Sequence, residues 1–575
     1  MRKQTIVPPP PRNLLEVFLT NGAKYKDSTA LIYKPGHRYE RLTYFELRHE
    51  ISKTAFMLKE IGIRSKDYVL ILSENRPEWV IVDIALMLVG AISVPIHKDS
   101  SKSHMQCIVN ETKPIAIFFS SEPLLRLLPR GSTSGILHYI AFEDNLDSST
   151  IKSFQKLLNK YHVDRAQTIG MWKDALSIQP QEIVTVVYSS GTTGKPKGAQ
   201  LTHQNILFMI LNNPMTKYGI AKKHSLFSLL PLSHVYGRIA DSLLPLYAGG
   251  SICYCRDPKN FMNEVRNCRP TMIMGVPILF EKIYDQIMQR MKPHIREKII
   301  SAVKGENSIS CRLIVSIIKR IIQKRFGGNI EYFICGGAKL NQDVIRFFEL
   351  CGILLLEGYG LTETAATVAM NEPAHFKIGT AGRILNGNHL CILDGEIIIK
   401  GPSVMLGYIN PEDMENAFTE DGYFKTGDLG SIDEEGYLTI LGRKKDMLVL
   451  STGENIAPIV IEQALLKSPY IDQTLVIGDG YKHVSAIIAV NSEEIGKHFD
   501  LGTVNVLVDE RIKHLIDAEV LRTTKDLPEN QQIRKYIMAR QPFTVDNNQL
   551  TTSLKPRRQE ILSFYAEEIK ELYGK

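Results

Sequence analysis

The sequence has few cysteines and no pattern of cysteines that suits a metal. Its 575 residues include eight cysteines, none of which forms a CxxC pair. Structural zinc sites usually need such pairs, and disulfide scaffolds need a higher cysteine density in a shorter chain. We therefore expect no structural zinc, no disulfide scaffold, and a reducing compartment such as the cytoplasm.

Export signals and membrane spans are also missing from the sequence pattern. Residues 1–12 are basic and rich in proline but lack the apolar core of a signal peptide. The longest apolar stretch, Val80–Ile96, contains Asp83 and ends in a strand-like Ser-Val-Pro-Ile segment. This stretch predicts a buried helix followed by a strand, rather than a membrane span.

No long run of like charge occurs. The chain has 69 basic and 62 acidic residues, which gives a net charge of +7 spread along its length. Without a basic run or the recurring aromatic residues of an RNA-binding surface, we expect no nucleic-acid partner. An apolar fraction of 44% and a charged fraction of 23% are typical of a globular protein. A chain of this length should form at least two domains.

Short apolar strands alternate with amphipathic helices in the first part of the chain. Thr43 and Glu46 form a capping-box pattern at the start of one predicted helix. Later, a strand at 330–335 is followed by a helix that begins after Asn341, and then by a strand at 353–356. This alternation predicts an α/β fold with a parallel sheet.

The pattern changes near residue 377 to short strands and turns, which predicts a small β subdomain. The charged segment Arg443–Asp446 follows a predicted strand and suits a linker between domains, although an ordinary surface turn would have the same composition. The remaining residues suit a small α/β domain. We therefore predict a large N-terminal domain, 1–442, and a small C-terminal domain, 443–575.

The segment Tyr188–Gly198, YSSGTTGKPKG, has the composition of a polyphosphate-binding loop. Glycines let backbone N–H groups approach an anion, hydroxyls donate hydrogen bonds, and lysines add positive charge. Only two residues separate Gly191 from Gly194, and Pro196 disfavours a helix beginning at the preceding lysine, so a Walker loop is disfavoured. A solvated surface turn is the alternative. The candidate residues are Ser189, Ser190, Gly191, Thr192, Thr193, Gly194, Lys195 and Lys197.

Polar motifs follow five strands of the predicted sheet. Because ligands of open α/β folds bind beyond the carboxyl ends of strands, these motifs are expected to converge on one crevice. The motifs are the phosphate loop, Pro231–His234, Gly275–Pro277, Gly336–Ala338 and Glu357–Gly360.

The phosphate loop resembles the signature of the adenylate-forming superfamily, which includes acyl-CoA synthetases, luciferases and peptide-synthetase adenylation domains. Other motifs match in family order over nearly the whole chain. They are LPLSHVYGR (230–238), GVPILFEKIY (275–284), EGYGLTET (357–364), DGYFKTGD (421–428) and GRKKDMLVLSTGENIAP (442–458). NRPEWV (75–80), GRKKDM and the Leu554-Lys555 pair resemble the long-chain fatty acyl-CoA synthetases. The resemblance implies a mobile C-terminal domain.

The resemblance also implies roles for residues of the large domain. The phosphate loop would hold the β- and γ-phosphates of ATP, and Glu363, beside the catalytic candidate Thr362, would bind Mg²⁺. The alternative for Glu363 is a helix cap. An adenine site is implied for Gly336, Gly337, Ala338 and Tyr359, and Glu357 and Gly360 are further residues implied to bind the nucleotide. Tyr359 taken alone would more often be a core aromatic residue.

His234 resembles the family residue near the acyl carboxylate, although a histidine in this setting is also typical of a structural or exposed position. Asp428 resembles the carboxylate that binds the ribose hydroxyls, with Arg443 as its companion, and a turn is its alternative. Lys555 resembles the adenylation lysine, and Lys445 the hinge. Many members have glycine before the adenylation lysine, whereas Leu554 stands here. Without the resemblance, Lys555 would be read as a solvated lysine.

The function implied is activation of a fatty acid, with ATP and Mg²⁺, followed by transfer of the acyl group to coenzyme A. Two alternatives stay open: a fatty acyl-AMP ligase that loads a carrier protein, and a non-catalytic relative that binds lipid or nucleotide. The apolar substrate and the positive charge suggest weak, reversible contact with the inner face of a membrane.

Overall fold

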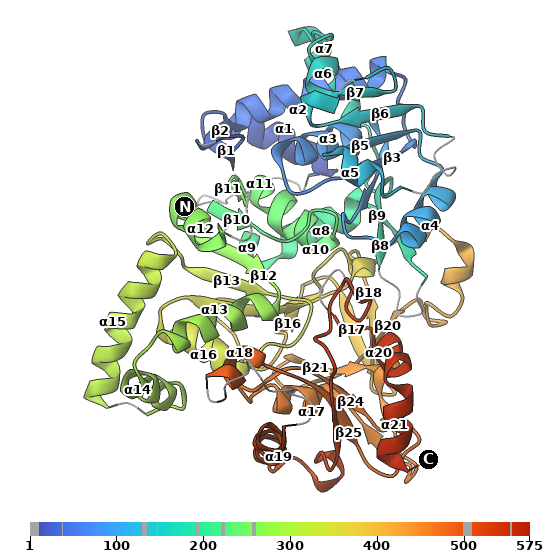
Figure 1. Cartoon of the computed structure of the whole chain (residues 1–575). Coiled ribbons are helices and arrows are strands. Elements are labelled where there is room, and N and C mark those ends of the chain that lie inside the picture. Colours follow the sequence, from blue (N-terminus) through green and yellow to red (C-terminus); the bar gives the residue numbers. More distant parts are fainter. Residues whose placement is uncertain are drawn as a thin grey trace, which may run out of the picture. The chain divides into compact units, whose positions relative to one another are not determined.

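The structure is a computed structural model of the chain (Figure 1). It describes residues 11–36, 38–128, 135–146, 148–189, 195–219, 225–255, 260–306, 308–497, 499, 509–551 and 555–574. Within these ranges, no helix is both long enough and apolar enough to cross a bilayer.

Contacts divide the chain into two compact units. Unit 1 comprises residues 1–391, 398–425 and 432–439, and unit 2 comprises residues 392–397, 426–431 and 440–575. The chain passes more than once between the units before entering the C-terminal part. The division at residue 442 predicted from the sequence therefore remains a proposal.

The larger sheet of unit 1 contains the parallel array predicted from the alternating pattern. Neighbouring strands β14, β13, β12, β10, β11 and β1 run parallel, and β2, β15 and β16 are antiparallel to their neighbours. In sheet order, the strands are β16 (Arg383–Ile384), β15 (Ala369–Met370), β14 (Leu354–Tyr359), β13 (Tyr332–Cys335), β12 (Met272–Gly275), β10 (Ser225–Ser228), β11 (Ser251–Tyr254), β1 (Thr29–Tyr33) and β2 (Glu40–Thr43).

A second sheet of unit 1 carries the phosphate-loop motif. Strands β8 and β9 pair antiparallel, from Ser189 opposite Lys197 to Ile183 opposite Thr202, and the loop joins them. The prediction that all five polar motifs follow strands of one sheet is therefore wrong, because β8 lies in this sheet. In order, the strands are β19 (Gly407–Tyr408), β9 (Lys197–Thr202), β8 (Ile183–Ser189), β4 (Ile92–Ile96), β3 (Tyr68–Leu72), β5 (Ala116–Phe119), β6 (His138–Ala141) and β7 (Ile151–Ser153).

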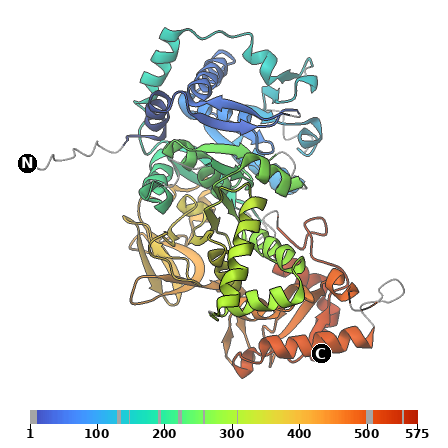
Figure 2. The ribbon, with the colours of Figure 1, turned by 90° about the vertical axis from the view of Figure 1, so that its left-hand side faces the viewer.

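The helices of unit 1 follow the sequence signals closely. Thr43 caps α2 and the reciprocal bond from Glu46 completes the capping box. The apolar stretch at 80–96 forms most of α3 and strand β4, both buried. The longer helices are α1 (Leu14–Lys24), α2 (Tyr44–Glu60), α3 (Pro77–Val89), α4 (Lys102–Thr112), α7 (Arg165–Ala175), α8 (His203–Asn212), α12 (Phe261–Cys268), α13 (Pro277–Gln289), α14 (Pro293–Val303), α15 (Ile309–Arg325) and α16 (Gln342–Leu350). Figures 1 and 2 show α14 and α15 side by side.

A buried ion pair connects three elements of unit 1. Arg238, at the end of α10 (Val235–Arg238), donates from Nε to Asp83 Oδ2 at 2.9 Å and from Nη2 to Asp83 Oδ1 at 2.6 Å. Nη2 also donates to Ser93 Oγ on β4 at 2.9 Å. Both charged side chains are only 1% exposed. A π-helix, Ile239–Leu243, follows directly, and this irregularity was not predicted from the sequence.

A smaller sheet matches the predicted β subdomain. Its strands, in order, are β17 (His389–Leu393), β18 (Glu396–Lys400), β20 (Phe424–Ile432) and β21 (Leu438–Arg443). Asp394 and Gly395 both have positive φ angles, of 51° and 78°, as expected for a tight Asp-Gly hairpin.

Unit 2 has the mixed α/β composition predicted for the C-terminal part. Antiparallel β24 (Ile471–Ile477) and β25 (Ser485–Val490) are joined by parallel β26 (Tyr536–Met538). A short pair, β22 (Leu448–Val449) and β23 (Asn455–Ile456), precedes them. The main helices of unit 2 are α17 (Pro458–Leu465), α19 (Glu510–Thr524), α20 (Arg558–Phe564) and α21 (Ala566–Tyr573).

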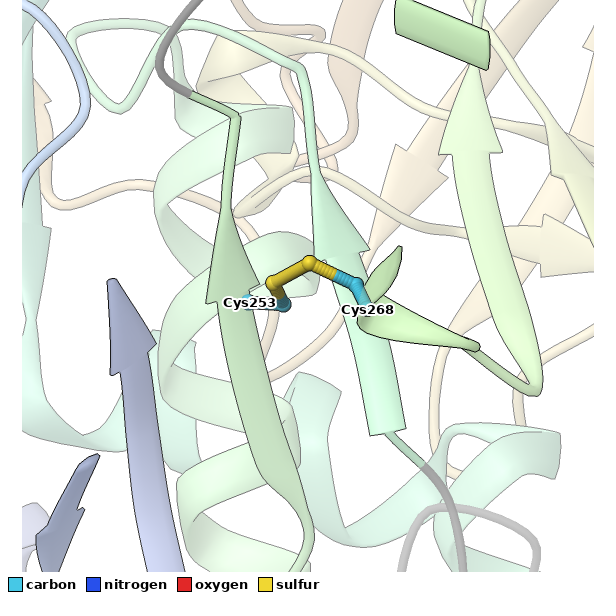
Figure 3. Close-up of a disulfide and its surroundings, with 2 residues drawn as sticks. All are labelled: Cys253 and Cys268. Atoms are coloured by element: carbon cyan, nitrogen blue, oxygen red, sulfur yellow. A yellow bond between two sulfur atoms is a disulfide. The ribbon is translucent and has the colours of Figure 1, made fainter. Parts of the chain in front are cut away.

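One disulfide joins Cys253 on β11 to Cys268 at the end of α12 (Figure 3). It is a single bond rather than a scaffold, but it departs from the expectation of a reducing compartment, where disulfides are rare. The spacing of 15 residues did not indicate that the two thiols face each other. That proximity depends on how α12 packs beside β11.

Candidate functional site

The two ends of the phosphate-loop motif are described, and its centre is not. Ser190, Gly191, Thr192, Thr193 and Gly194 lie outside the described residues. Ser189 ends β8, Lys197 begins β9, and Lys195 is exposed between them. The hairpin therefore fixes the positions from which the loop leaves and returns. The absence of a helix after Lys195 agrees with the argument from Pro196.

The Glu363 carboxylate accepts hydrogen bonds from two hydroxyl groups that come from distant parts of the chain. Its Oε1 accepts a hydrogen bond from Tyr408 OH at 2.9 Å and a longer one from Ser189 Oγ at 3.4 Å. Tyr408 lies on β19, which pairs with β9 so that Tyr408 is opposite Ala199. The alternative that Glu363 serves as a helix cap is wrong, because its carboxylate faces these side chains. Tyr408 was missed in the sequence analysis.

The two lysines of the motif have acidic neighbours. Lys197 Nζ lies 3.1 Å from Asp413 Oδ1 and 5.3 Å from the centre of the Tyr408 ring. Lys195 Nζ lies 3.8 Å from Glu111 Oε1, on α4. These ion pairs hold both ammonium groups at the base of the hairpin. Neither carboxylate could be assigned from a local motif, because each is far from the loop in sequence.

The backbone after β14 is tightly folded around Thr362 and Glu363. A side chain on Gly360 would place its Cβ only 1.8 Å from the carbonyl oxygen of Ala366. Ala365 and Ala366 have φ angles of 52° and 82°, which L-residues rarely adopt. Thr362 is buried within the 3₁₀ turn Thr362–Thr364. Strained backbone of this kind gathers at functional sites, where surrounding contacts fix it.

The residues predicted for adenine are brought together by strands β13 and β14. These strands pair in parallel with Cys335 opposite Glu357, so Gly336 and Gly337 follow one strand while Gly358 and Tyr359 end the other. Gly337 has a φ of 90° and is exposed, as is Ala338. The Tyr236 ring lies close to Gly336, 3.3 Å from where a Cβ would stand. Tyr236, an aromatic residue two positions after His234, was also missed.

Glu357 is a buried carboxyl group beneath these glycines. It is 8% exposed, and burial raises its pKa to about 7, although the Leu340 N–H and the Lys339 charge act in the opposite direction. The Leu340 N–H donates to Oε1 at 3.3 Å, and Oε2 has no hydrogen-bond partner among the described residues. A group with this pKa changes protonation near neutral pH.

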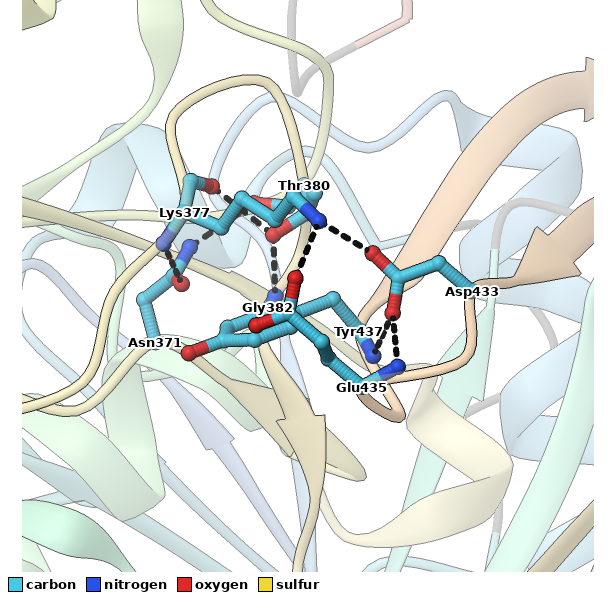
Figure 4. A network of polar contacts seen from close by, with 7 residues as sticks. All are labelled: Asn371, Lys377, Thr380, Gly382, Asp433, Glu435 and Tyr437. Atoms are coloured by element: carbon cyan, nitrogen blue, oxygen red, sulfur yellow. Dashed lines mark hydrogen bonds and ion pairs between the residues drawn. The ribbon is translucent and has the colours of Figure 1, made fainter.

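A polar network fixes the segment after β15 (Figure 4). The segment includes Gly379, whose backbone N–H lowers the pKa of Glu357. Lys377 Nζ donates to Asp433 at 2.7 Å and to Glu435 at 3.0 Å. Within the segment, Asn371 binds the carbonyl of Thr380 and the N–H of Lys377. The network therefore positions the segment next to Glu357.

His234 is exposed and accepts a hydrogen bond at Nδ1 from the Tyr236 N–H, 3.4 Å away, as the N-cap of α10. This N-cap bond is a structural role, and the place of His234 near the acyl carboxylate stays a prediction.

Unit 2 brings together three other predicted residues. Arg443 Nε lies 2.9 Å from Asp428 Oδ1, and Asp428 is 7% exposed at its side chain. Lys555 belongs to the same group. Although Lys555 keeps an exposed surface, loss of hydration around its amine lowers its pKa; the Arg443 charge lowers it further and Asp428 opposes this. Lys445 lies in the 3₁₀ turn Lys444–Asp446, directly after β21.

A surface cavity of about 550 Å³ lies elsewhere in unit 1, lined by residues that include Val303, Arg346 and Glu349. None of the predicted site residues lines it. We therefore assign it no part in the candidate site.

The chain matches known proteins over nearly its whole length. Residues 18–409 match the AMP-binding enzyme family, and residues 445–575 match the AMP-binding enzyme C-terminal domain. A long-chain-fatty-acid–CoA ligase of Mycobacterium bovis is 30% identical over 560 residues, covering 93% of this chain and 92% of the relative. A chloroplastic long-chain-fatty-acid–[acyl-carrier-protein] ligase of Arabidopsis thaliana is 28% identical, covering 97% and 86%.

The fold is shared with solved adenylation domains. The adenylation domain of a carboxylate reductase from Mycobacterium chelonae superimposes with a TM-score of 0.78 at 21% identity, covering 98% of this chain and 91% of that domain. At this identity the similarity shows the fold alone. The family matches and the order of the motifs together show that the chain belongs to the AMP-binding, adenylate-forming enzyme family and is similar to its long-chain fatty acyl-CoA synthetases.

Proposed function

We propose that this enzyme activates a long-chain fatty acid with ATP and then transfers the acyl group to coenzyme A. The observation that carries the proposal is the meeting of Ser189 and Tyr408 at the carboxylate of Glu363, beside the phosphate-loop hairpin. The similarity to a long-chain-fatty-acid–CoA ligase supports the choice of substrate and acceptor.

In this proposal, the hairpin and its lysines hold the β- and γ-phosphates of ATP. The loop residues Ser190–Gly194 would complete the cradle. Glu363 suits Mg²⁺, because magnesium favours one or two carboxylates together with phosphate oxygens. The Tyr408 hydroxyl donates to Oε1 and so fixes the orientation of the carboxylate. Bound magnesium would neutralise charge on the phosphates.

The nucleoside would lie over the exposed backbone of Gly337 and Ala338, with Tyr359 against the base. Gly360 and Glu357 would shape this site, and Thr362 would stand beside the reacting phosphate. Asp428 would accept hydrogen bonds from the ribose hydroxyls, with Arg443 orienting the carboxylate at 2.9 Å. His234 would lie near the acyl carboxylate.

The first step forms a bond between a carboxylate oxygen of the fatty acid and the α-phosphorus, and pyrophosphate leaves. Negative charge that develops at the phosphate would be stabilised by the Lys555 ammonium. In the second step, the sulfur of coenzyme A attacks the acyl carbon, AMP leaves, and the thiol proton passes to solvent. The C-terminal domain, 443–575, would change position between the steps about Lys445.

The carrier-protein ligase is the second candidate, and the similarity to an acyl-carrier-protein ligase favours it specifically. A non-catalytic relative is the third. Acid-dependent exchange of pyrophosphate into ATP tests activation, and AMP release with and without coenzyme A tests the acceptor. Exchange stimulated by long-chain acids, with AMP release that requires coenzyme A, is the expected result. Exchange together with AMP release that coenzyme A does not stimulate would favour a carrier protein, and no exchange would reject the enzyme.

The division of roles in unit 2 has its own test. Lys555→Ala should abolish exchange but keep thioester formation from supplied acyl-AMP, and Lys445→Pro should do the reverse. Equal loss of both half-reactions in either variant would reject the roles given to Lys555 and Lys445.

A further inference from the structure

Helix α15 carries a stripe of exposed apolar side chains on the face directed away from the core. Ile309, Leu313, Ile317 and Ile321 are 79%, 63%, 58% and 54% exposed. They stand four residues apart, so they form one continuous row along the helix, about 18 Å from first to last. Single exposed apolar residues are ordinary, but a row of this kind indicates a surface with a partner.

The opposite face of α15 already completes the core of unit 1. Cys311, Ile318 and Ile322 are buried there, and Ser308 caps the first turn. The exposed row is therefore not needed for packing within unit 1. Figures 1 and 2 show α15 at the periphery of unit 1, beside α14.

The charge of α15 is of one sign. The helix contains no aspartate or glutamate and has five basic residues. A second row of side chains lies beside the apolar stripe and contains three exposed basic residues, Arg312, Arg320 and Lys324. Lys319 is also exposed and lies next to Arg320. Arg325 has a lowered pKa because of burial and the nearby charge of Arg290, a further positive group at the same end.

The charge distinguishes between the occupants that an apolar stripe could accept. A second copy of α15 would place basic residues against basic residues, which costs free energy. An anionic bilayer matches both features, since apolar side chains enter the headgroup boundary while arginine and lysine contact lipid phosphates. We propose that α15 docks this protein on the surface of anionic membranes. The proposal does not depend on which acid the enzyme activates.

Flotation of the full-length protein with vesicles tests this proposal. Vesicles of phosphatidylcholine containing phosphatidylglycerol should carry the protein at low salt, and vesicles of phosphatidylcholine alone should carry much less. The double substitution Leu313→Glu/Ile317→Glu should weaken binding by about tenfold or more. Leu521→Glu is the matched control, because Leu521 is 69% exposed on α19 in unit 2. This control should bind as the unsubstituted protein does.

A variant that removes two positive charges from α15 tests the electrostatic part of the proposal. Arg320→Gln/Lys324→Gln should weaken binding to the anionic vesicles by about fivefold per removed charge, and the difference should shrink as salt rises. All these positions are exposed, so thermal unfolding and pyrophosphate exchange in vesicle-free solution should be unchanged.

Three results would overturn the proposal. The first is a failure of the unsubstituted protein to float with anionic vesicles at low salt. The second is an equal loss of binding in Leu521→Glu and in the α15 variants. The third is a vesicle-free dimer that Leu313→Glu/Ile317→Glu dissociates, since this would identify a second copy as the occupant.

Discussion

Removal of Asp83 should destabilise unit 1 strongly, because it would leave a buried arginine without its counterion. The two Arg238–Asp83 hydrogen bonds measure 2.9 and 2.6 Å, and both side chains are 1% exposed. The pair joins α3 to α10 and, through Ser93, to β4. In Asp83→Leu, the guanidinium would keep only the Ser93 hydroxyl among these partners.

The expected loss in the free energy of unfolding is about 3–5 kcal/mol, which is typical when one partner of a buried pair is removed. The double substitution Asp83→Leu/Arg238→Met removes the charge as well, so it should cost less than Asp83→Leu alone. Glu122→Gln is a control in the same unit. Its partner Arg126 is 75% exposed, and an exposed pair of this kind contributes about 0–1 kcal/mol.

Urea unfolding followed by tryptophan fluorescence measures this loss selectively. The chain has two tryptophans, Trp79 and Trp172, and both belong to unit 1. Trp79 lies 6.0 Å from the Arg238 guanidinium, so its emission reports directly on the region of the pair. If Asp83→Leu lowered the unfolding free energy no more than Glu122→Gln does, the reasoning about the buried charge would be refuted.

Three further predictions concern the candidate site. Tyr408→Phe should lower pyrophosphate exchange by about tenfold or more, because Glu363 would lose a 2.9 Å hydrogen bond to its carboxylate; unchanged exchange at limiting Mg²⁺ would contradict this role. Glu357 has a folded-state pKa of about 7 against an ordinary 4.5, so the folded protein binds its proton more tightly than the unfolded chain does. This contribution to stability is complete below pH 4.5 and is lost as pH rises through 7. The free energy of unfolding should fall by about 3 kcal/mol over this range. Glu357→Gln should therefore flatten the decline in urea midpoint over this range, and an unaltered pH profile would refute the assignment. Gly360→Ala should destabilise unit 1 by about 1–3 kcal/mol, since the added methyl group meets a carbonyl oxygen at 1.8 Å; a stability equal to that of the unsubstituted protein would contradict the close approach.

Local signals in the sequence predicted most of the secondary structure. This works because a helix or strand is set by residues that are close together in the sequence, as a capping box is. The capping box at Thr43 and Glu46 and the helix after Asn341 are examples that the structure confirms. The assignment of all five motifs to one sheet failed. Strand β8 reads like any other buried strand, and only its pairing with β9 and β4 shows which sheet contains it.

Side-chain partners within the site could not be predicted for a related reason. The hydrogen bond from Ser189 to Glu363 joins residues that are 174 positions apart in the sequence. The bond from Tyr408 to Glu363 joins residues that are 45 positions apart. Motif matching identified Ser189 and Glu363 because each lies in a characteristic string. Tyr408 lies in a two-residue strand, so no periodicity marks it. Its importance follows from the register that places it opposite Ala199, at the start of the strand after the phosphate loop.

The turn after Thr362 shows why chemistry and backbone propensity disagree at such a site. Alanine favours helix and rarely adopts a positive φ, so the sequence Thr-Ala-Ala would not predict two successive residues in that region. Yet Ala365 and Ala366 both adopt it, and the Ala366 carbonyl closes over Gly360. This conformation keeps the chain compact after β14 while the Glu363 carboxylate faces Ser189 and Tyr408. A regular helix here would rotate successive side chains by about 100° and could not keep this turn. The strain is therefore best explained by the position that it gives to Glu363.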